Sequence, residues 1–415
     1  IDTGVRAARL RTGPLVAMDQ RLLNAQALAG ASSHVASAPP AGAGHHDPVA
    51  REHMESVQLV QGGLVELGVP WGLAGIVAQD DRRVGLRIYL LDNSGSTTHA
   101  DGSVVRAGPD GRLVRRPCSR WEEICTFAED HARWNLSIGT PCEFILLNSL
   151  GRAGGSPMAE GRDYVRIART RGPETSQLEG LRVLLADNGP RGVTPITERL
   201  GDVRCRIQAG LAALAEARQM VFLTLVTDGL PTSPSSGEST PADKRSMMDT
   251  MRSLCTSLPV QLVIRLCTDE EQTIQFYNAI DEELELPLDI LDDLSGEARE
   301  LASHRNDWFA YTPVLHRIRE AGTLCKILDA IDERPLSPAE ARQLAELLCG
   351  AQEPLTSLSD REFVSRIGRA VARTPLVYDA RRQGMRPVID IRRLRVAMRV
   401  GFRGTCLRAV CRCLF

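Results

Sequence analysis

Short apolar runs that end in polar turns alternate with amphipathic stretches along the middle of the chain. An apolar run of about four to eight residues is typical of a buried strand, and apolar residues at every third or fourth position are typical of a helix. Their alternation predicts an α/β fold, with a doubly wound, mostly parallel six-stranded sheet and helices on both faces. The predicted strands are residues 86–91, 142–147, 164–168, 221–227, 260–267 and 286–291.

The link between the second and third predicted strands is rich in Gly, Arg and Ser and is too short for a crossover helix. We therefore expect residues 142–147 and 164–168 to pair antiparallel at the edge of the sheet. Between the other strands the apolar spacing predicts helices over 121–132, 177–185, 196–214, 242–258 and 270–283.

The N-terminal part differs from this alternating pattern. Residues 1–50 are rich in Ala, Gly and Pro and bury too little apolar surface to offset the entropy of ordering, so they predict a disordered lead. Residues 51–84 predict a helical lead-in, and residues 85–305 hold the alternating α/β domain.

The C-terminal part, residues 306–415, predicts a helical region, in which Ser337 and Ser359 each begin a capping box. Residues 381–415 contain ten arginines against one acid. Such a tail is either a solvated helical face or a surface that contacts acidic protein, phosphate or lipid headgroups.

Composition narrows the class of protein. Of the 415 residues, 43% are hydrophobic and 25% charged, which is typical of a soluble globular protein. The formal net charge of −2 argues against a whole-chain nucleic-acid or membrane binder. The eleven cysteines are scattered and odd in number, which favours a reducing, cytoplasmic compartment. No apolar run has the length of a transmembrane helix.

The candidate chemistry begins where the first predicted strand ends. The strand over 86–91 runs into Asp92-Asn93-Ser94-Gly95-Ser96, which places a carboxylate and two hydroxyls at alternate positions. Three such oxygens can point toward one hard cation such as Mg²⁺, which prefers oxygen ligands. A strand-end turn without a metal is the simpler alternative for this motif alone.

Two further segments supply side-chain oxygens, one directly before a predicted helix and one at the end of a predicted strand. Thr194 precedes a predicted helix, and the strand over 221–227 ends in Asp228-Gly229. Together with the first motif, they resemble the metal-ion-dependent adhesion site of the von Willebrand factor A (integrin I-type) domain, over roughly residues 85–300. The resemblance assigns the metal ligands as Asp92, Ser94, Ser96, Thr194 and Asp228.

The resemblance implies a protein-binding module and no enzyme. Mg²⁺ (or Mn²⁺) would keep one position open for a carboxylate of a partner protein, and the two aspartates would repel each other until a cation neutralises them. One alternative is a Mg²⁺-dependent hydrolase or phosphatase. That chemistry requires a second carboxylate two residues after Asp92 as a general acid, and this chain has Ser94 there. Another is a scaffold with a degenerate metal site.

The sequence departs from the family pattern directly after Ser96. About two dozen residues precede the next helix, and the turn signals Asp101-Gly102 and Asp110-Gly111 occur among them. We expect an inserted β-hairpin at about 98–118, which either covers the site or forms part of its binding face.

Overall fold

The computed structural model describes residues 48–399 except 109–111, 151–155, 234–235, 285, 351–354 and 356. Most of the predicted disordered lead and the tail after residue 399 lie outside the described residues. Among the described helices, none combines the length and apolar character that a membrane span requires.

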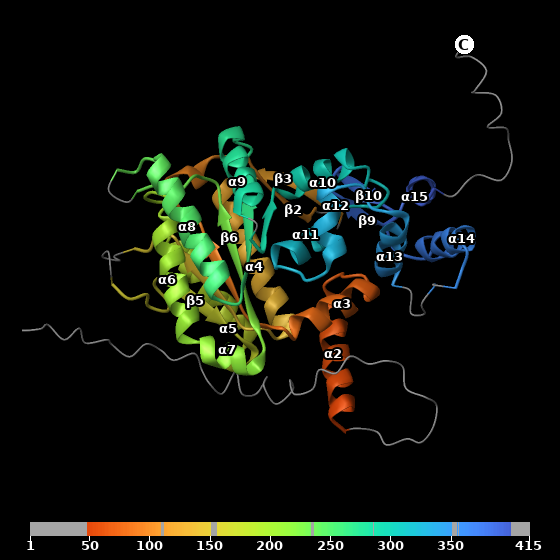
Figure 1. The fold of residues 1–415 in the computed structure, drawn as a ribbon, viewed down its shortest axis with the longest axis horizontal. Helices are drawn as coiled ribbons and strands as arrows, with labels where there is room; N and C mark the ends of the chain where they lie inside the picture. The colour runs from red at the N-terminus through yellow and green to blue at the C-terminus, as the bar shows by residue number, and fades with distance from the viewer. Residues whose placement is uncertain are drawn as a thin grey trace, which may run out of the picture.

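A six-stranded sheet organises the chain, as the apolar runs predicted (Figure 1). Its strand order is β5-β4-β1-β6-β7-β8, and all neighbours are parallel except the edge pair β4 and β5. The predicted antiparallel edge is therefore confirmed. The strands are β1 (Val84–Leu91), β4 (Cys142–Leu146), β5 (Tyr164–Ile167), β6 (Met220–Thr227), β7 (Val260–Leu266) and β8 (Leu288–Leu291).

Both sides of the central strand β1 are buried, because alternate side chains of a strand point to opposite faces of its sheet. Ile88 and Leu90 pack in one hydrophobic cluster, and Tyr89 and Leu91 pack in another. The first cluster includes side chains of α6 (Ile196–Ala209), α7 (Leu211–Ala217), α8 (Pro241–Ser257) and α9 (Glu271–Leu284), and the second includes those of α4 (Arg120–Ile138) and α5 (Glu174–Asp187).

One predicted helix is wrong in length. The apolar spacing over 196–214 predicted a single helix, but α6 ends at Ala209 and α7 starts at Leu211. Gly210 caps the first and begins the second, with φ −99° and ψ 2°. Glycine is a poor residue for a helix interior, so the chain turns there although the apolar positions continue.

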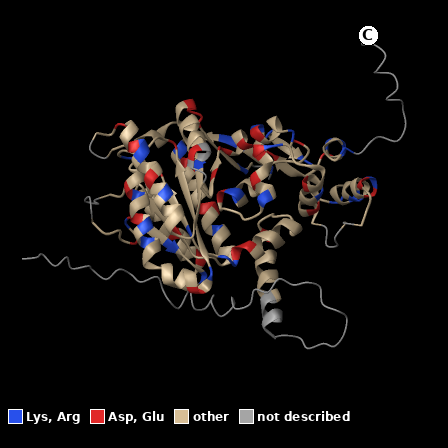
Figure 2. Cartoon of the chain, viewed as in Figure 1, with Lys and Arg blue, Asp and Glu red and all other residues tan. Residues whose placement is uncertain are grey.

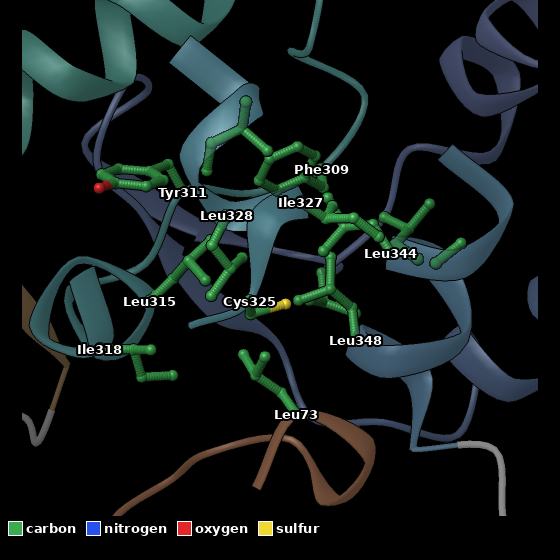
Figure 3. Packing of buried hydrophobic residues seen from close by; sticks show 14 of the residues in the cluster. Leu73, Phe309, Tyr311, Leu315, Ile318, Cys325, Ile327, Leu328, Leu344 and Leu348 are labelled. Carbon is green, nitrogen blue, oxygen red and sulfur yellow. The ribbon is translucent and has the colours of Figure 1, made fainter. Parts of the chain in front are cut away.

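A third hydrophobic cluster joins the helical lead-in to the C-terminal helices. Figure 3 shows Leu73 of the lead-in together with Leu315, Leu328 and Leu348, which come from three different C-terminal helices. The two ends of the described chain thus share one core. Besides Trp134 and Ile138 of α4, its helices are α2 (Pro48–Glu66), α3 (Trp71–Asp81), α10 (Leu294–Ser303), α11 (Pro313–Glu320), α12 (Lys326–Glu333), α13 (Pro338–Cys349), α14 (Asp360–Val371) and α15 (Ile391–Ala397).

The C-terminal region is not purely helical. Between α14 and α15 lies a two-stranded antiparallel ribbon of β9 (Val377–Asp379) and β10 (Gly384–Arg386), which the sequence pattern did not predict. Strands this short carry too few side chains to show an alternating pattern.

The end of α11 packs against the sheet. The Thr224 hydroxyl of β6 donates to the carbonyl of Glu320 at 2.9 Å, and Nε of Arg87 in β1 donates to the carbonyl of Ala321 at 3.1 Å. The next residue, Gly322, has a left-handed backbone (φ +80°), and a Cβ there would collide with the ring of Phe222. These contacts fix the C-terminal region onto the same body as the sheet.

The predicted inserted hairpin is present directly before α4. Its strands β2 (Gly102–Ala107) and β3 (Leu113–Cys118) pair antiparallel, from Gly102 opposite Cys118 to Ala107 opposite Leu113. Its base therefore lies beside the turn that follows β1.

Candidate functional site

Asp92 and Asp228 follow two neighbouring parallel strands, β1 and β6. Because the carboxyl ends of parallel strands meet at one edge of a sheet, the turns that carry these aspartates lie together. The backbone N–H of Asp92 donates to the carbonyl of Val226 at 2.9 Å, which ties the two turns. Both aspartates are buried, with 0% and 1% of their surface exposed.

A chain of hydrogen bonds connects four of the five predicted ligands. The backbone N–H of Ser94 donates to Oδ1 of Asp92 at 2.8 Å. The hydroxyls of Ser94 and Ser96 lie 3.0 Å apart, and the Ser96 hydroxyl donates to Oδ1 of Asp228 at 2.9 Å. The Thr227 hydroxyl completes the set by donating to Oδ2 of Asp92 at 2.6 Å. The structure therefore brings these oxygens together as the motif predicted.

The fifth predicted ligand, Thr194, reaches the same place on a separate loop. The carbonyl of Gly192, which has φ +68°, accepts the N–H of Gly95 at 3.1 Å. The N–H of Thr194 donates to the Thr232 hydroxyl at 2.7 Å. A Cβ on Gly229 would lie 3.6 Å from the Thr194 hydroxyl oxygen, so this hydroxyl faces the turn after β6.

Asn93, to which the sequence pattern assigned no role, holds the loops of the site together. Its side-chain amide donates to the carbonyls of Asn148 and Asn188, at 2.6 and 2.9 Å, and its amide oxygen accepts the N–H of Asn148 at 2.8 Å. The side chain of Asn148 in turn donates to the carbonyl of Val193 at 2.7 Å. A single buried amide thereby positions the turn after β1 relative to the Thr194 loop.

Arg120 is the main residue that sequence reasoning missed. It begins α4, and one guanidinium nitrogen donates to Oδ2 of Asp228 at 2.9 Å. Its other two nitrogens donate to the two carboxylate oxygens of Asp101, each at 2.7 Å. Asp101 lies at the base of the inserted hairpin, so Arg120 connects the hairpin to the site.

This arginine changes the electrostatics that the sequence predicted. We expected the two aspartates to repel each other until a metal neutralised them. The charge of Asp228 does raise the pKa of Asp92, but a buried guanidinium also bonds Asp228. Hydrogen bonds to Asp101 and then Asp228 raise the pKa of Arg120, and Arg120 lowers the pKa of Asp101.

Among the described residues, no Lys or Arg side chain forms an ion pair with Asp92. Burial, and then the charge of Asp228, raise the pKa of Asp92 to about 6, against the opposing hydrogen bonds from Thr227 and Ser94. A positive charge beside Asp92 would stabilise its ionised form. A cation would therefore give the most electrostatic stabilisation next to the Asp92 carboxylate.

The donor set fits a hard cation. It consists of carboxylate and hydroxyl oxygens, the ligands that Mg²⁺ prefers. Both carboxylate oxygens of Asp228 already accept hydrogen bonds, from Ser96 and Arg120. Each carboxylate oxygen has two lone pairs, so a cation that bound Asp228, directly or through water, would share the carboxylate with these donors.

The described part of the chain contains a second acidic cluster, but two of its carboxylates are already paired with an arginine. The carboxylates of Glu297, Glu300 and Asp332 have oxygens within 4.8 Å of one another. The buried guanidinium of Arg319, however, pairs with both Glu297 and Asp332. This cluster is therefore an internal ion-pair network of the C-terminal region.

The sequence near Thr227, Asp101 and Arg120 gave little indication that these residues belong to the site. Thr227 directly precedes Asp228 in the chain, and its hydroxyl at the strand end could have indicated a place in the site. Asp101 and Arg120 are separated by the whole hairpin, and only its closure by β2 and β3 brings them together.

The chain matches no protein-family model and no curated protein.

Proposed function

We propose that this chain is a metal-dependent protein-binding module of the von Willebrand factor A type, with a doubly wound sheet. The ligand set for Mg²⁺ (or Mn²⁺) would be Asp92, Ser94, Ser96, Thr194 and Asp228. The observation that supports it most is the hydrogen-bonded chain from Asp92 through both serines to Asp228, at the carboxyl ends of adjacent strands.

The chemistry of the site is suited to binding a carboxylate through a cation. A bound Mg²⁺ would supply an electrophilic position for an oxygen of an acidic partner residue. Thr194 and Ser96 contribute neutral oxygens, and Arg120 offsets the charge of Asp228. Few negative charges would then remain around the cation, which favours an additional anionic ligand from a partner.

A scaffold with a degenerate metal site is the second candidate, and one specific contact favours it. Arg120 gives Asp228 a permanent positive partner, which is the electrostatic role that a metal would otherwise have. In this case the site would stabilise the fold and the hairpin without binding a cation.

Thermal melts of the full chain in Mg²⁺, in Mn²⁺ and in EDTA distinguish the two candidates. A metal at about 100 times its Kd adds roughly 2.7 kcal/mol to the free energy of unfolding. We expect both metals to raise the melting temperature of the wild type and of Asp249→Asn, an exposed control, but not that of Asp92→Asn. Identical curves in all three solutions would favour the scaffold.

Pull-downs with Mg²⁺ and with EDTA then test partner binding. Proteins retained by the wild type only in Mg²⁺, and lost with Asp92→Asn, are expected for a metal-dependent module. Equal retention in EDTA would show that any partner binds elsewhere.

A further inference from the structure

A cavity of about 500 Å³ lies in the C-terminal region, far along the chain from the strand-end site. Its walls come from residues 305–308 after α10, residues 334–338 between α12 and the start of α13, and residues 393–399 in and after α15. This volume is within the range of roughly 300–1,000 Å³ that is common for small-ligand pockets. The proposed function uses none of its residues.

The cavity wall is strongly basic. Four arginines line it, Arg305, Arg334, Arg393 and Arg399, against one acid, Asp307. Elsewhere Lys and Arg are interspersed with Asp and Glu (Figure 2), and the formal net charge of the chain is −2. The arginines therefore form a local excess of positive charge, which we call the arginine pocket.

The acid does not cancel this charge. Asp307 bonds two guanidinium groups, those of Arg393 and of Arg381, the second at 2.6 Å. Arg334 pairs with Glu340 outside the cavity wall, at 2.6 Å. Two lining arginines, Arg334 and Arg393, are thus held in place by carboxylates.

The other two arginines, Arg305 and Arg399, have no such partners among the described residues. Within the described residues, neither Arg305 nor Arg399 makes a side-chain hydrogen bond or ion pair, and both side chains are exposed. Both have left-handed backbones, with φ 61° and 55°, where α10 and α15 end. Non-glycine residues adopt this conformation uncommonly, and here it turns the chain so that both arginines border the same cavity.

Trp308 forms a large apolar part of the cavity wall and is 1% exposed. Its indole nitrogen has no hydrogen-bond partner among the described residues and is itself buried, so this N–H is not open to the cavity.

We propose that the arginine pocket binds a phosphate-bearing anion. A phosphate group offers several acceptor oxygens, and arginine binds phosphate through pairs of parallel hydrogen bonds. Arg305 and Arg399 supply unpaired donors for it. Soluble phosphate esters and phosphorylated lipid headgroups share this chemistry.

Titration calorimetry with the full chain in EDTA tests this, because EDTA keeps the strand-end site free of metal. The probes are inorganic phosphate, glucose 6-phosphate, and phosphatidylcholine vesicles with and without a phosphatidylinositol phosphate, with chloride at matched ionic strength as the blank. We expect saturable binding of at least one phosphate probe. Binding of vesicles alone would identify a headgroup as the source, and binding of the soluble probes would identify a free ester.

The variants separate a built site from general charge attraction. Arg305→Gln/Arg399→Gln should weaken binding about tenfold or more. The matched control, Arg116→Gln/Arg245→Gln, removes two exposed arginines that lie outside the cavity wall and should bind as the wild type does. Unchanged affinity in the Arg305/Arg399 variant, equal loss in the control, or no binding of any probe would each overturn the proposal.

Discussion

The Arg120 guanidinium donates to Oδ2 of Asp228 at 2.9 Å, at the edge of the sheet where β1 and β6 end. Arg120 is 6% exposed and Asp228 1% exposed, so water screens this pair weakly. Because the same guanidinium also donates two hydrogen bonds to Asp101 at the base of the hairpin, Arg120 couples the hairpin to the site. A cation that binds here must share Asp228 with an arginine.

Replacing Arg120 by Met should destabilise the metal-free protein and increase its response to metal. Loss of the guanidinium leaves Asp228 buried without a counter-charge, which typically costs about 3–5 kcal/mol. A divalent cation can restore that charge, so Mg²⁺ should recover more stability in Arg120→Met than in the wild type. The measurement is urea unfolding in EDTA and in Mg²⁺.

The control for this prediction is Asp101→Asn. The side chain of Asp101 is 50% exposed, so its ion pair is expected to contribute at most about 1 kcal/mol. Its metal response should match that of the wild type. If Arg120→Met gains no more from Mg²⁺ than the wild type does, the idea that Arg120 and a metal neutralise the same carboxylate fails.

Thr194→Val should separate metal binding from folding. Among the described residues the Thr194 hydroxyl makes no hydrogen bond, so its loss should change the metal-free free energy of unfolding by less than about 1 kcal/mol. The Mg²⁺-induced rise in melting temperature should shrink, because one ligand oxygen is gone. Thr232→Val is the contrast: it removes the acceptor of the Thr194 N–H and should cost about 0.5–1.5 kcal/mol in EDTA. The reverse pattern would make Thr194 a structural residue.

Local sequence patterns predicted the parts of this molecule that depend on local spacing. The strands before Asp92 and Asp228 are uninterrupted apolar runs, and such runs mark buried parallel strands without knowledge of their neighbours. Because parallel strands end at one edge, the convergence of the two aspartates followed from the strand assignment alone.

Features that depend on long-range packing could not be predicted. No spacing rule relates Arg120 to Asp228, since 108 residues separate them. The common core of the lead-in and the C-terminal helices, seen for Leu73 and Leu348, arises from helices at opposite ends of the described chain. At Gly210, the apolar period continued while the backbone turned, so the spacing alone indicated a longer helix.

Stability should fall as the pH is lowered from 7.5 to 5, in part because of His131. Burial lowers the pKa of His131 below its ordinary value of about 6.5, against the opposing effect of Glu320, whose carboxylate lies 3.2 Å from Nε2. Below pH 6.5 the unfolded chain therefore binds a proton that the folded protein takes up less readily, which favours unfolding. The contribution is present above the unfolded pKa and is lost as the pH falls through the folded one.

His131→Gln keeps a donor for Glu320 and removes the titrating ring, so its free energy of unfolding should vary less between pH 7.5 and 5 than that of the wild type. Exposed His99, replaced in the same way, provides the control and should leave the pH dependence unchanged. Urea unfolding at the two pH values measures both. Parallel pH dependence in wild type and His131→Gln would exclude His131 as a source of acid sensitivity.

Gly322→Ala should be among the most destabilising single substitutions at the junction of α11 and the sheet. The residue has φ +80°, and an added Cβ would meet the ring of Phe222 in β6, which is itself 1% exposed and has no room to move. The left-handed backbone and the overpacking together should cost about 2–5 kcal/mol. The matched control is Gly180→Ala in the interior of α5, where the new methyl group meets open space and alanine should stabilise the helix by about 0.5–1 kcal/mol. Urea unfolding of the two variants, run beside the wild type, should therefore move in opposite directions. A Gly322→Ala protein as stable as the wild type would mean that α11 does not hold its place on the sheet as tightly as these contacts require.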